Sequence, residues 1–230
     1  MTPMRLQPGE EPTPGTVIDR LPVFPLPNAV FFPNTLLPLH VFEPRYRALV
    51  QRVMETDQRM GVALLRPGFE GSYHENPPIH DVICMGEVVT LQDLPDGRSN
   101  VLLRGLSRVR VLGELDTAEV FRVMRVRVEA DEMGGQQGDA LERQVATVRQ
   151  LFSTVIARVP QLQIQDAGVL FTPDADPAFV LDSIASAVPA DPRHKQELLE
   201  ERDLVKRAEL LAEVLAEAVA DTLTASRGNV

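Results

Sequence analysis

The chain has 230 residues, of which 44% are hydrophobic, and carries a net charge of −10. This length suits one large domain or two small ones, and the apolar fraction is sufficient for a folded core. A single cysteine, Cys84, excludes an intramolecular disulfide and a zinc site made of cysteines. No apolar run approaches the ~18 residues that cross a bilayer, so we expect no membrane partner.

The N-terminal segment is polar and rich in proline, and it lacks the apolar core of a secretory signal. We therefore expect a cytoplasmic protein in which residues 1–19 form a flexible tail. Residues 20–130 are electrically neutral, whereas residues 131–230 carry a net charge of −8. Such a difference in charge along the chain predicts two structural units.

Residues 21–46 read LPVFPLPNAVFFPNTLLPLHVFEPRY and contain six prolines among valine, leucine and phenylalanine. Proline cannot donate a hydrogen bond to a β ladder, so strands that contain it must lie at edges, bulges or corners. The stretch predicts a small, bent and partly closed β structure. Strands are expected at 21–26, 29–32 and 35–42, and further along at 60–66, 82–92, 100–115 and 121–129.

One helix interrupts these strands at residues 43–57. Pro44 suits a first helical turn, and the apolar residues that follow recur at helical spacing. Asp96-Gly97 predicts a hairpin turn because glycine tolerates positive φ. Residues 107–112 and 121–129 alternate polar and apolar side chains, as half-buried antiparallel strands do.

The glycine-rich segment 131–139 predicts a linker, and residues 140–225 predict a helical subdomain. A helical pattern runs from Leu141 to Val159 and ends before Pro160. A segment at 161–171 has no clear helical pattern, and a further helix is expected at 176–189. Residues 190–223 predict one helix, or two that separate near Asp203, with an apolar seam from Leu204 to Thr222 that would pack on the other helices.

The ordered set LPVFPL (21–26), VFFP (30–33), PLHVFEPRYRALV (38–50) and MGEVVTLQDLPDGRSNVLLRGLSRVRV (85–111) resembles the N-terminal, substrate-binding domain of the Lon protease family. The resemblance covers about residues 20–220. It implies an α+β fold in which a PUA-like β pseudo-barrel with one helix precedes a small C-terminal helical bundle.

Lon proteases also contain an ATPase module and a protease domain with a serine-lysine dyad, and this sequence has neither signature. No glycine-rich phosphate loop precedes Lys195 or Lys206, the only two lysines. A lysine that activates serine must be desolvated, whereas these two lie among charged residues and are expected to be solvated. We therefore expect a stand-alone domain that is not an enzyme and needs no cofactor.

Histidine and cysteine chemistry adds little to this interpretation. His40, near Glu43, is interpreted as a structural hydrogen-bonding residue. His74 and His80 lie in a loop whose spacing matches no metal motif, although a weak metal site and a solvated loop are equally consistent with it. Cys84 lies in an apolar strand and is interpreted as an inert buried thiol. Because no metal motif is present, we assign no metal site.

The function that the resemblance implies is recognition of polypeptide, either an unfolded segment or a partner protein. Strands broken by proline leave unpaired edge groups that can accept an extended peptide. Phe32, Phe69 and Tyr73 are the candidate peptide-binding residues, with core packing as the alternative for each. A homo-oligomer that forms through strand edges or the helix seam is also consistent with the sequence.

Two other functions remain as alternatives, because PUA-like folds also bind RNA. Arg108 and Arg110 share one strand face, as do Arg125 and Arg127, so the four could form a basic patch if the strands pair. Nearby glutamates and the scarcity of aromatic residues argue against nucleic acid as the partner. The second alternative is a small hydrolase with an unrecognised site.

Overall fold

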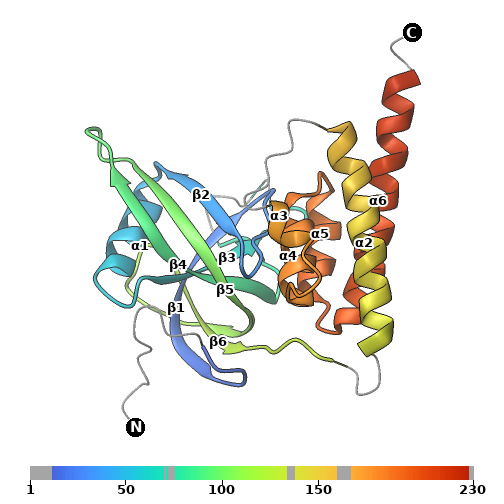
Figure 1. Ribbon diagram of the computed structural model, residues 1–230. Helices are drawn as coiled ribbons and strands as arrows, with labels where there is room; N and C mark the ends of the chain where they lie inside the picture. The colour runs from blue at the N-terminus through green and yellow to red at the C-terminus, as the bar shows by residue number, and fades with distance from the viewer. Residues whose placement is uncertain (1–11, 70, 72–75, 134–137, 160–166, 228–230) are drawn as a thin grey trace. The chain divides into compact units, whose positions relative to one another are not determined.

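The computed structural model describes residues 12–69, 71, 76–133, 138–159 and 167–227, with the side chains of residues 167 and 222–227 excepted. The chain divides into two compact units, residues 1–130 and 131–230. The first contains the sheet and one helix, and the second is helical (Figure 1). The α+β class predicted from the sequence is therefore confirmed. Among the described residues, no helix combines the length and the apolar character needed to cross a bilayer.

The strands of the first unit form a closed ring with one strand added to it. Their bounds are β1 Val17–Leu26, β2 Leu36–Val41, β3 Arg59–Leu64, β4 Val82–Asp93, β5 Ser99–Glu114 and β6 Arg122–Val128. The order in the sheet is β2-β5-β4-β3-β1-β6, and β5 also pairs with β6. This last pairing closes β1, β3, β4, β5 and β6 into a barrel. Among the pairings of these six described strands, only that of β1 with β3 is parallel.

The long strand β5 belongs to the ring and also carries β2. Its first part, residues 99–104, pairs with β2, whereas residues 109–114 pair with β6. The barrel interior is filled by aliphatic and methionine side chains from several strands, which is the packing expected of a small barrel. The core cluster consists of Leu21, Val23, Ala63, Leu65, Ile79, Ile83, Met85, Val109, Met124, Val126 and Val128.

The prolines inside strands lie where a ladder can tolerate them. Pro22 lies where β1 pairs with β6, and Pro25 lies where β1 pairs with β3. At each proline, β1 therefore pairs with one strand only, and the side of the strand without a partner does not need an N–H donor. Pro38 lies in β2, the edge strand. The prediction that these prolines mark edges and irregular pairing agrees with this register.

One predicted strand, at residues 29–32, is absent, and this segment is a buried loop. Its apolar side chains pack in the core, although its backbone pairs with no strand. The apolar pattern that predicted a strand is therefore explained by burial alone. The loop ends in a bulge: the amide of Asn34, with φ +60°, donates to the carbonyl of Gly105, and the amide of Gly105 donates to that of Thr35. Asparagine tolerates the left-handed conformation that this kind of bulge requires.

Helix α1, Pro44–Met54, packs against the barrel as its apolar stripe predicts. Its buried residues are Tyr46, Leu49, Val50 and Val53. The Tyr46 ring stacks on Phe24 of β1, with 4.2 Å between ring centroids. The turn at 94–98 forms the predicted β4–β5 hairpin, in which Gly97 has φ +79°.

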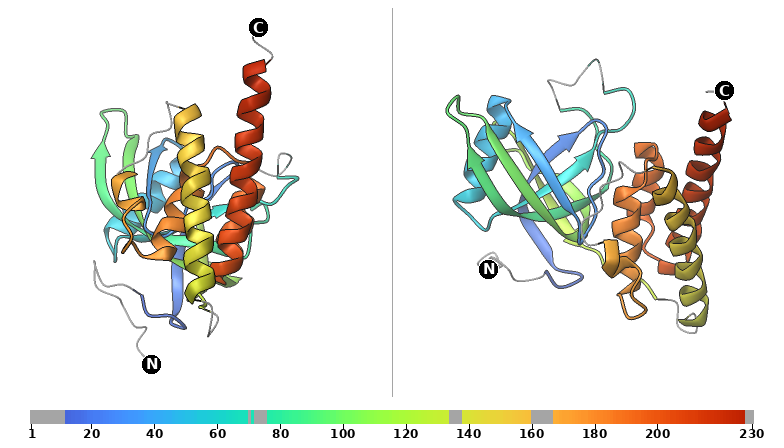
Figure 2. Two further views of the ribbon diagram at one scale, coloured as in Figure 1. Left: turned by 45° about the vertical axis from the view of Figure 1, so that its right-hand side comes forward. Right: turned by 45° about the horizontal axis from the view of Figure 1, so that its top comes forward.

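The helices of the second unit are α2 Gly138–Arg158, α3 Ala167–Leu170, α4 Pro177–Ala187, α5 Pro192–Glu200 and α6 Leu204–Arg227. Both views in Figure 2 show α2 (yellow) beside α6 (red). Asp176 and Asp191 cap the N-termini of α4 and α5 by accepting backbone hydrogen bonds. The side-chain hydrogen bond from Arg193 lowers the pKa of Asp191 to about 2.

The break between α5 and α6 surrounds a buried arginine. Arg207, on α6, is fully buried. Its guanidinium lies 3.3 Å from the Asp182 carboxylate and bonds that of Asp131, and its Nε donates to the carbonyl of Glu201 (2.8 Å). Asp203 caps α6 by accepting from the amide of Val205. The second of the two arrangements predicted for residues 190–223 is therefore the observed one.

Candidate functional site

The three aromatic residues proposed as peptide anchors have different surroundings. Phe32 is fully buried, so its ring packs in the core and offers no surface to a ligand. Phe69 is partly buried and packs against the barrel core. Tyr73 lies outside the described residues. The structure therefore excludes Phe32 from a binding surface, and of the two described rings only that of Phe69 keeps an exposed part.

The four arginines of the proposed basic patch lie on paired strands, but they do not form an uncompensated surface. Arg110 of β5 lies directly opposite Arg127 of β6. The carboxylate of Glu129 lies 3.4 Å from both guanidinium groups. Arg108, by contrast, is buried at 3% exposure, so its side chain is not available to a phosphate backbone.

The fourth member, Arg125, pairs with Asp19 of β1 at 3.1 Å, and both side chains are more than half exposed. The carboxylates therefore neutralise the part of the patch that reaches solvent. This charge compensation weakens the case for RNA, because affinity for nucleic acid depends chiefly on uncompensated positive charge.

His40 has the structural role expected of it, although its partner is not Glu43. Its Nδ1 lies 2.8 Å from Oδ1 of Asn100, and the Asn100 amide donates to Gln92 at 3.1 Å. His74 lies outside the described residues. Within the described ranges, no group of three or more histidine, cysteine, aspartate or glutamate residues is placed to hold a metal ion. Cys84 is buried, as expected.

Lys195 differs from the sequence expectation, because it is largely buried and only partly exposed to solvent. Its Nζ donates to the backbone carbonyl of Ser186 at 2.7 Å, near the C-terminal end of α4. Burial lowers the pKa of this lysine to about 8. A cation is favourable at this end of a helix, so the contact has a structural explanation. The amine is partly desolvated, but its bonded partner is a carbonyl oxygen and not a serine hydroxyl.

The largest of the described hollows on the barrel is a groove between α1 and the β4–β5 hairpin, with a volume of about 690 Å³. Val50, Met54 and Leu91 provide an apolar floor. Arg47 reaches across from α1 to the turn, and a Cβ on Gly97 would lie 2.3 Å from its guanidinium. Figure 1 shows α1 beside this hairpin. We call this hollow the α1–hairpin groove.

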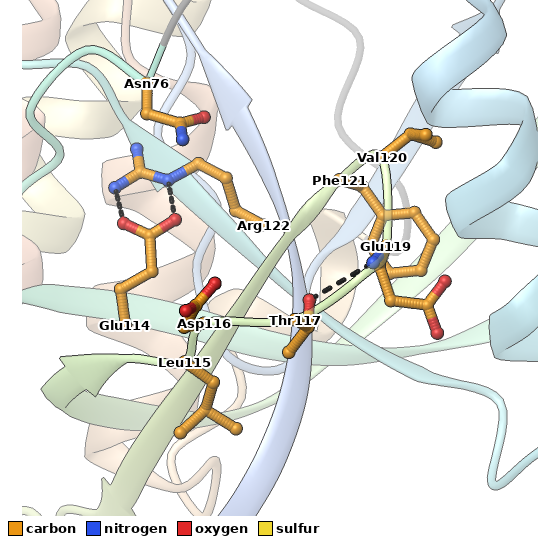
Figure 3. A pocket seen from close by; sticks show the side chains of 9 residues that line it. All are labelled: Asn76, Glu114, Leu115, Asp116, Thr117, Glu119, Val120, Phe121 and Arg122. Atoms are coloured by element: carbon orange, nitrogen blue, oxygen red, sulfur yellow. Dashed lines mark hydrogen bonds and ion pairs between the residues drawn. The ribbon is translucent and has the colours of Figure 1, made fainter.

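A second hollow, of about 400 Å³, lies where β5 ends and β6 begins (Figure 3). Its lining includes the bidentate ion pair of Arg122 and Glu114, with nitrogen–oxygen distances of 2.9 and 2.7 Å. Arg122 also donates to the carbonyl of Pro77. The charges of Arg122 and Glu114 therefore neutralise each other, and Glu119, also in the lining, pairs with Arg52 of α1 at 3.1 Å, so these ion pairs have a structural explanation.

The third hollow, about 360 Å³, lies on the outer face of β2, β5 and β4. Pro38 of β2 and Leu102 of β5 are ladder partners at its centre. His40, Asn100 and Gln92 form a hydrogen-bonded row on one side. Arg104 and Glu87 form an ion pair of 2.5 Å on the neighbouring part of the same strands. We call this surface the β2 face.

Known proteins share both the sequence pattern and the fold. A family model for the ATP-dependent protease La (LON) substrate-binding domain matches residues 20–217. Lon protease 2 of Myxococcus xanthus is 31% identical over 199 residues, and Lon protease 2 of Herpetosiphon aurantiacus is 28% identical over the same number. These alignments cover 85% and 86% of this chain. The chain spans about a quarter of the length of these relatives, at 23% and 24%.

Two solved structures agree with this relationship. The N-terminal domain of Lon protease from the Mycobacterium avium complex superposes with a TM-score of 0.68 at 14% identity, over 86% of this chain and 98% of that one. A Lon N-terminal domain protein from Xanthomonas campestris gives 0.57 at 26% identity, over 84% and 97%. The fold agrees with both structures, and the family model covers most of the sequence. The chain belongs to the LON substrate-binding domain family.

Proposed function

We propose that this chain is a non-catalytic module that binds polypeptide, either unfolded segments or a partner protein. The match to a substrate-binding domain over residues 20–217 carries this proposal. Any chemical step on the bound polypeptide would then be supplied by a separate catalytic unit.

The α1–hairpin groove supports the proposal because of its size and lining. An apolar floor with a polar rim can accept side chains of an extended polypeptide while the backbone stays hydrated. A few apolar anchors contribute about 2 kcal/mol each, against an association cost of roughly 4–15 kcal/mol. We therefore expect weak binding, in the micromolar range or above, that multivalent display would strengthen.

A direct test is the anisotropy of a fluorescently labelled, permanently unfolded polypeptide titrated with the full chain. The expected result is saturable binding that the folded form of the same polypeptide does not show. Met54→Glu and Leu91→Asp place charge on the floor of the groove and should weaken binding. Leu112→Glu is the matched control, because Leu112 is exposed on β5 and does not line the groove. Absence of saturable binding to any unfolded polypeptide would overturn the proposal.

A further inference from the structure

We propose that the outer edge of β2 binds an extended, uncharged segment of unfolded polypeptide by strand addition. This inference rests on the proposed function and adds a second contact for the same polypeptide, at the edge of β2, to the one in the α1–hairpin groove. The occupant is a heterologous chain, and its backbone would form the next strand of the sheet beside β2.

The direction of the β2 backbone groups follows from one hydrogen bond. The amide of Gly105 in β5 donates to the carbonyl of Thr35 at 2.9 Å, so this carbonyl points toward β5. Backbone polar groups of successive residues point to opposite sides of a strand, so those of alternate residues share one side. The regular register of β2 and β5 extends from Leu36 to Val41. The backbone groups that point away from β5 are therefore those of Leu36, Pro38 and His40.

No other strand occupies that side of β2 within the described residues. β2 is the terminal strand in the sheet order, and the ring of five strands closes without it. Among the described residues, no backbone hydrogen bond from outside the sheet reaches Leu36, Pro38 or His40. An edge of this kind presents two amides and three carbonyls, since proline has no N–H.

The side chains around this edge select an uncharged segment. Leu36 is 38% exposed, and Phe42, directly after the strand, is 59% exposed. Pro38 and Leu102 continue the apolar surface across the β2 face. The polar groups beside it are already paired, as the His40–Asn100 contact and the Arg104–Glu87 ion pair show. A charged segment would find no free countercharge there, whereas an apolar segment would cover Leu36 and Phe42.

Pro38 argues against a second copy of this chain as the occupant. In a symmetric antiparallel pair of β2 strands centred on residue 38, two prolines would oppose each other and two ladder hydrogen bonds would be lost. A heterologous strand meets one proline and loses one bond. Proline at the edge therefore disfavours self-association more than it disfavours binding of another polypeptide.

The experiment compares His40→Pro with His40→Ala in the full chain, using the labelled unfolded polypeptide. His40→Pro removes the outward amide, whereas His40→Ala removes the imidazole and keeps that amide. We expect His40→Pro to weaken binding about fivefold or more and His40→Ala to bind within about twofold of the original chain. Circular dichroism and thermal melting establish that both variants fold.

A second measurement does not depend on variants. Hydrogen exchange at the amides of Leu36 and His40 should slow when polypeptide binds, whereas the amides of Leu37 and Leu39 already face β5. Equal binding by both His40 variants, or unchanged exchange at Leu36 and His40 in the bound chain, would overturn the edge site while leaving the proposed function intact. A dimer of the unliganded chain that His40→Pro dissociates would identify a second copy as the occupant and would also overturn the inference. No binding by the original chain would instead count against the proposed function.

Discussion

Arg110 and Arg127 lie directly opposite each other on β5 and β6, and both approach the same oxygen of Glu129 at 3.4 Å. Like charges directly opposite in a ladder destabilise a sheet, so a shared carboxylate offsets this repulsion. The Glu129 side chain is only 5% exposed, which limits screening by solvent. The Glu129 carboxylate therefore compensates the positive charges of Arg110 and Arg127, which the sequence pattern alone would predict to form a basic surface.

Glu129→Gln is expected to lower the free energy of unfolding by about 1–3 kcal/mol, because it leaves facing guanidinium groups without their carboxylate. Chemical denaturation measures this change. Asp19→Asn is the control: it removes the carboxylate from an ion pair whose side chains are both more than half exposed, so it should change stability by less than about 1 kcal/mol. Equal effects of the two variants would contradict this account.

The same substitution bears on nucleic acid binding. The original chain should show no salt-sensitive binding to single-stranded RNA, since the exposed arginines of the proposed basic patch are paired with carboxylates. Glu129→Gln should raise affinity for RNA at low salt, because counterion release follows uncompensated positive charge. Fluorescence anisotropy across a range of salt concentrations distinguishes these outcomes. Strong RNA binding by the original chain would instead revive the RNA-binding alternative.

Gly105 is expected to tolerate no side chain. A Cβ at this position would lie 2.1 Å from the carbonyl oxygen of Phe32, a backbone atom that cannot move aside without shifting the buried loop. Gly105→Ala should therefore destabilise the barrel by about 2 kcal/mol or more. Gly113→Ala is the matched control on the same strand, because no atom outside its immediate chain neighbours lies within 4 Å of a Cβ there. Thermal and urea denaturation of the pair provide the comparison.

The buried Arg207 makes a prediction for the helical unit. Arg207→Leu leaves the carboxylate of Asp182, which is 1% exposed, without the guanidinium beside it. A loss of roughly 3–5 kcal/mol is expected, as for other buried ion pairs that lose one partner. The double variant Arg207→Leu, Asp182→Leu should recover part of this loss, because it removes the isolated buried charge as well. Equal stability of the single and double variants would argue against the charge as the cause.

Lys195 makes stability depend on pH in the alkaline range. Burial lowers its pKa in the folded state to about 8, from 10.5. Between these values the unfolded chain binds more protons than the folded one, so the free energy of unfolding rises with pH across this window. The full effect corresponds to about 3 kcal/mol at most. It should appear as a difference between the original chain and Lys195→Met in denaturation at pH 7.5 and pH 10.5, and parallel pH profiles would contradict it.

Local sequence patterns predicted most elements of the fold but not their surroundings. The stripe of α1 and the alternation in β6 identify their elements, because burial follows the period of each. The strand predicted at residues 29–32 is wrong, because the apolar run before Pro33 reflects burial in the core and not pairing with another strand. The prediction that Lys195 is solvated, made from its charged neighbours in the sequence, is wrong for a geometric reason. Arg193 and Glu197 are two residues away on the helix and do not share its face.

The candidate surfaces were harder to predict than the fold. The prolines indicate that some strand is an edge, but only the register shows that Pro38 directs its nitrogen away from β5. Phe32 is a candidate anchor on the sequence alone, with core packing as its alternative, and the structure has it fully buried. Which residues surround the α1–hairpin groove depends on contacts between segments far apart in the chain, and local patterns carry no information about these contacts.

Closure of the ring has a consequence for synthesis of the protein. Val17 in β1 pairs with Arg127 in β6, so the two strands that complete the barrel come from its two ends. On the ribosome the barrel therefore stays open until β6 has emerged from the exit tunnel. Until then β1 lacks its antiparallel partner β6. Pairing between distant segments also slows folding, since the loop must close before the contacts form. Until then the nascent chain itself exposes the kind of extended apolar segment that the finished domain is proposed to bind.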